Sequence, residues 1–328
     1  MSGLAAWASG WLLSRRRPQD AAHKFLPRDG GLFSNINFLV GEMYRGSIVY
    51  PVFSTEEDFN NGQPLKHFAY LSPDCANSWM EFFEPLQYGD GDQRHLDTQW
   101  VRSLPSTQGL ESDPVFRIPS QTIALYQGPD FPVWRESVSR CLAGRLRPTR
   151  AIREQIATMV SSMPGRRIGV HVRHPSHQVE QGQVFFRQYF QVVDDLCAQS
   201  PDASIFLATD NELAVAAFVL RYGDRVRYYP DFSRESIDNI LEWAYSLLTG
   251  RSDGMGFVSG VGFQSHYRAA ASDDRTLGLR MGREAVADVF TLARCDDFVC
   301  TASNFTLACA YLNPEQRQHL VSSGPPSP

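Results

Sequence analysis

The chain has 328 residues, of which 43% are hydrophobic and 20% are charged. This is the composition of a soluble globular protein, and the length suffices for two domains that each bury a core. The formal net charge of −5 at pH 7 argues against a broad basic surface for nucleic acid, although it allows a local basic pocket.

The N-terminal segment 2–13, SGLAAWASGWLL, is apolar and is followed by three arginines at 15–17. It is too short to span a bilayer, and its charges follow the apolar stretch, which is the reverse of a secretory signal. We expect a packed or frayed amphipathic helix, with a peripheral membrane contact as the alternative.

None of the six cysteines belongs to a CxxC pair. Cys295 and Cys300 flank an apolar run, so we expect buried apolar residues rather than metal ligands or disulfide partners. This usage indicates a reducing compartment. We therefore expect a cytoplasmic protein, membrane-peripheral if the N-terminal segment binds lipid.

Residues 25–125 are rich in turns and aromatic side chains. Segment 46–53 is rich in β-branched and aromatic residues, which predicts a strand. Segment 75–86 is predicted to be helical and 118–126 to be extended. The many Gly, Asp, Ser and Pro residues of 88–115 indicate a surface loop.

Residues 131–163 are predicted to be mostly helical. In 150–163 the apolar residues follow the i, i+4, i+7, i+8 pattern, and Pro164-Gly165 ends the helix. We place the domain boundary here, with an N-terminal domain at 1–150 and a C-terminal domain at 151–328.

In the C-terminal half, short apolar runs alternate with helical patterns. Alternation of this kind predicts βαβ units and a parallel sheet, whose ligands bind beyond the carboxyl ends of the strands. The expected strands are 168–172, 204–210, 225–229 and 297–301, and the expected helices are 184–198, 211–222, 284–294 and 304–312.

Polar residues follow three of these strands. Arg173 and His174 come after the first, Asp210 is the polar end of the second, and Ser303 and Asn304 come after the last. A guanidinium fork suits phosphate, and the free N–H groups of a helix N-terminus favour an anion. The sequence therefore predicts a site for a phosphate-bearing ligand, delivered above all by Arg173.

Each of these residues has a plainer alternative. Arg173 could form a structural ion pair with Asp210, His171 could be a satisfied core histidine, and Ser303 could be only a helix N-cap. No GxGxxG follows a strand, and no P-loop, GxSxG or HExxH motif occurs, which disfavours dinucleotide dehydrogenases and P-loop enzymes. The glycine-rich segment 254–262 is interpreted as a loop.

Three motifs in this order resemble the donor half of the fucosyltransferase superfamily, which includes the α1,6-fucosyltransferases and the protein O-fucosyltransferases. They are IGVHVRH at 168–174, FLATDN at 206–211 and GREAVADVFTLARCDDFVCTASNFTLA at 282–308. A fainter similarity lies in GGLFSNIN at 30–37. The resemblance covers about residues 165–310. It implies an α/β, GT-B-like fold: two Rossmann-like domains with a cleft, the acceptor on the N-terminal side and GDP-fucose on the C-terminal side.

Carried over by position, the resemblance implies roles for single residues. Arg173 and Ser303, with Asn304 beside it, would hold the β-phosphate of GDP. His171 and Asp288 would recognise guanine, whose N1–H and N2–H edge suits a carboxylate. Arg283 matches the family arginine five positions before Asp288, and Asp210 would shape the pocket behind the phosphate.

The implied reaction is an inverting, metal-independent transfer of fucose from GDP-fucose to a hydroxyl of a glycan or a protein. Glu180 is the candidate base, with His174 and His177 as alternatives; the plain interpretation of Glu180 is a solvated loop residue. Segment 251–282 could form a lid over the donor or a surface loop. Two other functions stay open: a non-catalytic nucleotide- or glycan-binding protein, and a transferase for another nucleotide sugar.

Overall fold

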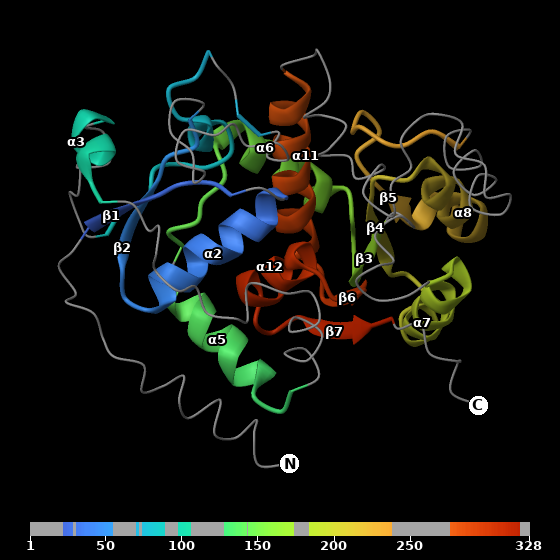
Figure 1. Ribbon diagram of the computed structural model, residues 1–328. Helices are drawn as coiled ribbons and strands as arrows, with labels where there is room; N and C mark the ends of the chain where they lie inside the picture. The colour runs from blue at the N-terminus through green and yellow to red at the C-terminus, as the bar shows by residue number, and fades with distance from the viewer. Residues whose placement is uncertain are drawn as a thin grey trace, which may run out of the picture.

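The computed structural model describes residues 22–28, 31–54, 70–71, 74–88, 98–105, 128–142, 144–173, 184–237 and 276–321. Figure 1 shows the chain as an α/β protein in which helices cover a parallel sheet. The elements of the N-terminal half are β1 (Ala22–Phe25), α2 (Leu32–Tyr44), β2 (Ile48–Pro51), η1 (Ser78–Glu81), α3 (Thr98–Ser103) and α5 (Phe131–Leu142). Those that follow are α6 (Arg150–Ser161), β3 (Arg167–Val172), α7 (Phe186–Gln199), β4 (Ser204–Thr209), α8 (Glu212–Tyr222), η5 (Gly223–Arg225), β5 (Val226–Arg227), α11 (Leu277–Leu292), β6 (Asp297–Cys300), α12 (Asn304–Leu312) and β7 (Arg317–Leu320).

The five-stranded sheet of the C-terminal half has the order β5-β4-β3-β6-β7, and all its pairs are parallel. This confirms the predicted α/β alternation. From β3 the chain proceeds outward to β4 and β5, and it later returns to β6 and continues to β7 on the other side. The strand order therefore reverses between β3 and β6, the point at which open α/β sheets bind their ligands.

Alternating residues of β3 face two different helix layers. Ile168, Val170 and Val172 pack with apolar residues of α7 and α8. Gly169 faces the other way, where an added Cβ would lie 3.0 Å from Leu292 of α11. The sheet is thus buried on both faces, which explains why its strands are continuous apolar runs.

The N-terminal half contains β1 and β2 as a parallel pair, with α2 as the connection between them (Figure 1). Neither β1 nor α2 was predicted. Ten of the thirteen residues of α2 are buried, so the helix lacks the polar face that creates a period of 3.6. It packs against α12 and α5.

One hydrophobic cluster runs through both halves of the chain. It extends from Phe25 and Ile36 through Phe83 and Ile156 to Tyr311. A second cluster fills the space between the sheet and the helices α7 and α8. The boundary near residue 150 stays a prediction, because these contacts describe packing and not independent folding.

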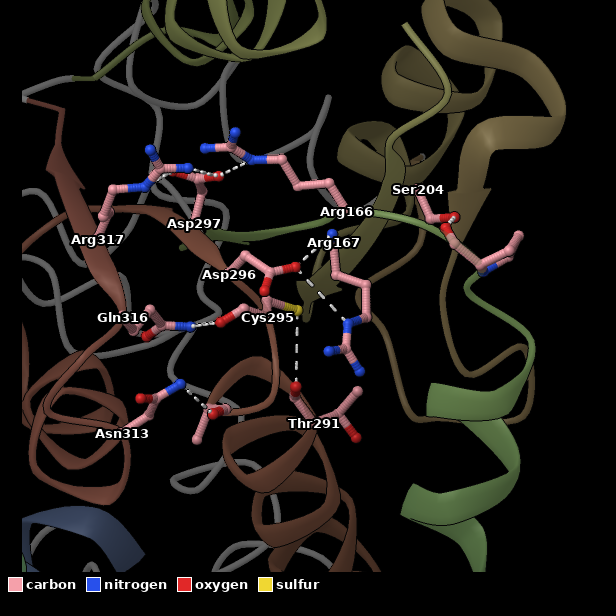
Figure 2. A network of polar contacts seen from close by, with 12 residues as sticks. Arg166, Arg167, Ser204, Thr291, Cys295, Asp296, Asp297, Asn313, Gln316 and Arg317 are labelled. Carbon is pink, nitrogen blue, oxygen red and sulfur yellow. Dashed lines mark hydrogen bonds and ion pairs between the residues drawn. The ribbon is translucent and has the colours of Figure 1, made fainter. Parts of the chain in front are cut away.

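A buried carboxylate joins three strands at the amino edge of the sheet (Figure 2). Asp297, at the start of β6, accepts hydrogen bonds from Arg166 Nε at 2.7 Å and Arg317 Nη2 at 3.0 Å. His319 Nε2 lies 3.0 Å from the other oxygen of Asp297. Arg166 precedes β3, and Arg317 and His319 belong to β7, so this network holds the amino ends of neighbouring strands together.

The structure corrects three predictions of secondary structure. Segment 75–86 is not an α-helix but a short 3-10 turn, η1. Asn77 prevents a helix there, because its side chain accepts from the N–H groups of Phe53 and Trp79 and donates to the carbonyl of Pro51. The predicted strand 225–229 is reduced to β5, and the predicted loop 88–115 contains α3.

Other boundaries differ from the predictions or lie beyond what the structure describes. The helix predicted from residue 284 begins seven residues earlier, at Leu277, and β7 was not predicted. The remaining helices and strands of the C-terminal half lie where they were expected. Segments 2–17, 118–126 and 251–275 lie outside the described residues. Cys295 and Cys300 are buried and unpaired, as predicted.

Candidate functional site

The candidate site lies at the carboxyl edge of the sheet, where β3 and β6 are neighbours and their connections leave in opposite directions. Arg173 follows β3 directly, and Ser303 lies three residues beyond the end of β6. The hydroxyl of Tyr189, from α7, hydrogen-bonds to the backbone of Arg173 and to the side chain of Thr301. Burial raises the pKa of Tyr189, and these two bonds partly oppose that effect. The predicted meeting of these two strand ends is confirmed.

His171 is buried on the α12 side of the sheet and is 8% exposed. Its ring stacks on Phe305 with 4.3 Å between centroids and 16° between planes. Burial, with a smaller contribution from the charge of Arg173, lowers the pKa of His171 to about 3, so the imidazole is neutral near pH 7. Its Nδ1 is buried and has no hydrogen-bond partner among the described residues, which is unusual for a core histidine.

Ser303 is the N-cap of α12, as its plainer interpretation predicted. Its Oγ accepts from the N–H of Thr306 at 3.2 Å, and its own N–H donates to Thr306 Oγ1 at 2.9 Å. This reciprocal pair is a capping box. The N–H groups of Asn304 and Phe305 have no hydrogen-bond partner in the described part of the chain. The backbone of the first helical turn is therefore the available donor, while the Ser303 hydroxyl already serves the cap.

A second helix N-terminus lies beside that of α12. Gly31 is the N-cap of α2 and has no side chain to accept from the first turn. Phe33, near the start of α2, contacts Phe305, near the start of α12, with 5.4 Å between ring centroids in an edge arrangement. The sequence did not predict this second helix N-terminus, because it did not predict α2. The similarity of segment 30–37, with its two glycines, to the family was the one indication that this segment belongs to the site.

An acidic group lines another side of the same edge. Asp210 follows β4, while Glu284 and Asp288 lie one turn apart on α11. Burial raises the pKa of Asp288 well above its usual range, with smaller contributions from the charges of Glu284 and Asp210, and Arg234 opposes the effect. Glu284, whose pKa is also raised by burial, accepts from the N–H and hydroxyl of Ser233 at 3.0 and 3.2 Å.

Arg283 and Asp288, which the resemblance matches to the family motif, face different surroundings in the structure. Arg283 is half-exposed and forms an ion pair with Glu81 of η1. Five positions along a helix place two side chains about 140° apart, so Arg283 and Asp288 point in different directions. Glu180, His174 and His177 lie outside the described residues.

The part of the chain that the structure describes contains neither a metal-binding cluster nor a helix that could span a membrane. No group of three or more His, Cys, Asp or Glu side chains is arranged to hold a metal ion in the described ranges. Within the same ranges, no helix combines the length and the apolar character that a membrane crossing demands.

Comparisons with known proteins gave matches only among solved structures. No protein-family model matches the chain, and no curated protein matches it. A structure of NodZ α1,6-fucosyltransferase soaked with GDP-fucose matches with a TM-score of 0.45 and 16% sequence identity, covering 89% of this chain and 93% of that one. NodZ from Bradyrhizobium matches with a TM-score of 0.46 and 17% identity, over 88% and 93% of the two chains. POFUT1 in complex with GDP matches with a TM-score of 0.44 and 9% identity, over 93% and 99%.

Proposed function

We propose that this chain is a glycosyltransferase that moves fucose from GDP-fucose to a hydroxyl acceptor, with inversion and without a metal ion. The observation that supports this most is the convergence of two helix N-termini beside Arg173, where the strand order of the sheet reverses. The free N–H groups of Asn304 and Phe305, the positive ends of two helix dipoles and a guanidinium together suit a diphosphate.

The expected affinity follows from these donors. A hydrogen bond to a charged group contributes about 1.5–3 kcal/mol, which is about 10- to 150-fold in a dissociation constant. Arg173 and the N–H groups of Asn304 and Phe305 provide several such bonds. This set can hold a diphosphate with protein groups alone.

The acidic side of the edge supports a guanine base. In this proposal the two donors of the guanine edge, N1–H and N2–H, offset the burial that raises the pKa of Asp288, so that Asp288 binds them as the carboxylate; adenine cannot supply these donors. The unpartnered Nδ1 of the neutral His171 offers a further hydrogen bond to the nucleotide. Asp210 is proposed to line the pocket behind the phosphate, and Arg283 to lie at the rim of that pocket.

The reaction is one displacement at the anomeric carbon. The acceptor hydroxyl attacks, the bond to the β-phosphate oxygen breaks, and GDP leaves with additional negative charge on that oxygen. Arg173 and the first turn of α12 stabilise this charge as it develops. Glu180 is the proposed base that takes the hydroxyl proton, with His174 and His177 as the alternatives.

The test is slow hydrolysis of the donor, which requires no knowledge of the acceptor. A panel of GDP- and UDP-sugars is incubated with the protein in EDTA, and the release of nucleotide is measured. We expect hydrolysis of GDP-fucose, abolished by Arg173→Ala. Arg150→Ala, which removes an exposed arginine on α6, is the matched control and should hydrolyse as the unmodified chain does.

The panel also separates the alternatives. Hydrolysis of a different nucleotide sugar would replace fucose as the donor sugar. GDP binding without any hydrolysis or transfer would favour the non-catalytic nucleotide-binding protein.

A further inference from the structure

Asn37 of α2 connects the two halves of the chain next to the candidate site. It is fully buried at 0% exposure, yet its amide makes three hydrogen bonds. Its Nδ2 donates to the backbone carbonyl of Asn304 at 2.9 Å and to Asn304 Oδ1 at 3.0 Å. Its Oδ1 accepts from the hydroxyl of Tyr311 at 2.8 Å.

These partners determine the orientation of the Asn37 amide. A backbone carbonyl can only accept, so the NH₂ group of Asn37 must face Asn304. The Tyr311 hydroxyl lies on the other side and can supply the proton that Oδ1 needs. A reversed amide would place two oxygen acceptors against each other in a buried interface, which is costly.

The orientation of Asn37 in turn sets that of Asn304. Because the NH₂ of Asn37 donates to Asn304 Oδ1, the Asn304 amide has its oxygen toward α2 and its own NH₂ on the opposite side. That NH₂ group has no hydrogen-bond partner within the described ranges. Asn304 is also the first residue of α12, so its side-chain donor belongs to the same helix turn as the free N–H groups.

We propose that Asn37 is a positioning residue that holds the Asn304 NH₂ group toward the diphosphate of the nucleotide sugar. The N-terminal half of the chain thereby sets the affinity of a donor that the C-terminal half binds. This inference rests on the proposed function and gives Asn37, the last residue of segment 30–37, a specific role.

The decisive variant is Asn37→Asp, because a carboxylate can accept but cannot donate. Asn304 would turn its own NH₂ toward Asp and present its oxygen to the phosphate. We expect GDP to bind at least about tenfold more weakly in calorimetry with EDTA, the loss of one hydrogen bond to a charged group. In an Asn304→Ala background, the same change at position 37 should weaken GDP binding by less than about twofold further, because the group that it acts through is absent.

Asn313→Asp is the matched control. Asn313, at the other end of α12, also donates from Nδ2 to a backbone carbonyl, that of Ala293 at 2.9 Å. The control should lower the melting temperature while GDP affinity stays unchanged. Should Asn37→Asp fail to fold, Asn37→Ser replaces it; the shorter side chain releases the Asn304 amide, and GDP affinity should fall by about threefold or more.

The outcomes separate this inference from the function it rests on. Unmodified protein that binds GDP, with Asn37→Asp or Asn37→Ser binding it equally well, overturns the positioning role alone. Equal losses from the position-37 change with and without Asn304 also overturn it. Unmodified protein that binds no GDP overturns the proposed function and this inference together.

Discussion

Asp297→Asn removes the carboxylate of β6 that binds Arg166, which precedes β3, and Arg317 and His319 of β7. The carboxylate is 0% exposed and contacts Arg166 and Arg317, as Figure 2 shows. It also contacts His319. An amide of the same shape leaves these groups without a counter-charge and turns a donor toward one of them. The expected result is a less stable protein whose sheet keeps its strand order.

The burial of Asp297 and of its partners sets the expected loss in the free energy of unfolding. Removing one partner of a buried ion pair costs about 3–5 kcal/mol. Here the side chains of Arg166, His319 and Arg317 are 25%, 31% and 55% exposed and can regain water, so we expect the lower end, about 3 kcal/mol. Such a loss lowers Tm by about 4 °C if the whole chain unfolds as one unit.

The neighbouring residue provides the control. Asp296 accepts from the N–H of Arg167 at 2.8 Å, but its side chain is 46% exposed, so Asp296→Asn should cost less than about 1 kcal/mol. Urea unfolding followed by circular dichroism measures both variants. Equal losses for Asp296→Asn and Asp297→Asn would refute the claim that the buried carboxylate secures the amino edge.

Two further predictions concern α11. Burial raises the pKa of Asp288 in the folded chain, so folding favours the protonated acid and stability falls as pH rises above the usual aspartate range. Asp288→Asn should therefore stabilise the protein more at pH 8 than at pH 5. An equal gain in stability at both pH values would contradict burial as the cause. Gly282→Ala should lower the free energy of unfolding by about 1–3 kcal/mol, because the added Cβ would lie 2.5 Å from the ring of Phe82. The double variant with Phe82→Leu should regain part of that loss in the same urea assay. If it regains none, the contact with Phe82 is not the cause of the loss.

The parallel sheet was predictable from the sequence because each of its central strands is a short apolar run bounded by polar residues. Segment 204–209 is buried at every position, and the helices around it keep one polar face. The same reasoning failed for α2, which is buried nearly all round, and for β7, whose sequence RQHL contains a single apolar residue. Their structure depends on partners far along the chain.

The residues of the site that follow the predictable strands could be predicted, and those on α2 could not. Arg173 and Asn304 could be placed because each follows a predictable strand in a parallel sheet. The second helix N-terminus and Asn37 could not, because the bond from Asn37 to Asn304 spans 267 positions in sequence. The opposed directions of Arg283 and Asp288 likewise needed the observed helix.

Titration of GDP and UDP into the unmodified chain and Arg173→Ala, in EDTA, tests the central claim most directly. The account predicts that the unmodified chain binds GDP and not UDP, and that Arg173→Ala weakens GDP binding by at least about tenfold with an unchanged melting temperature. Preference for UDP, or equal affinity of the two proteins for GDP, would contradict it.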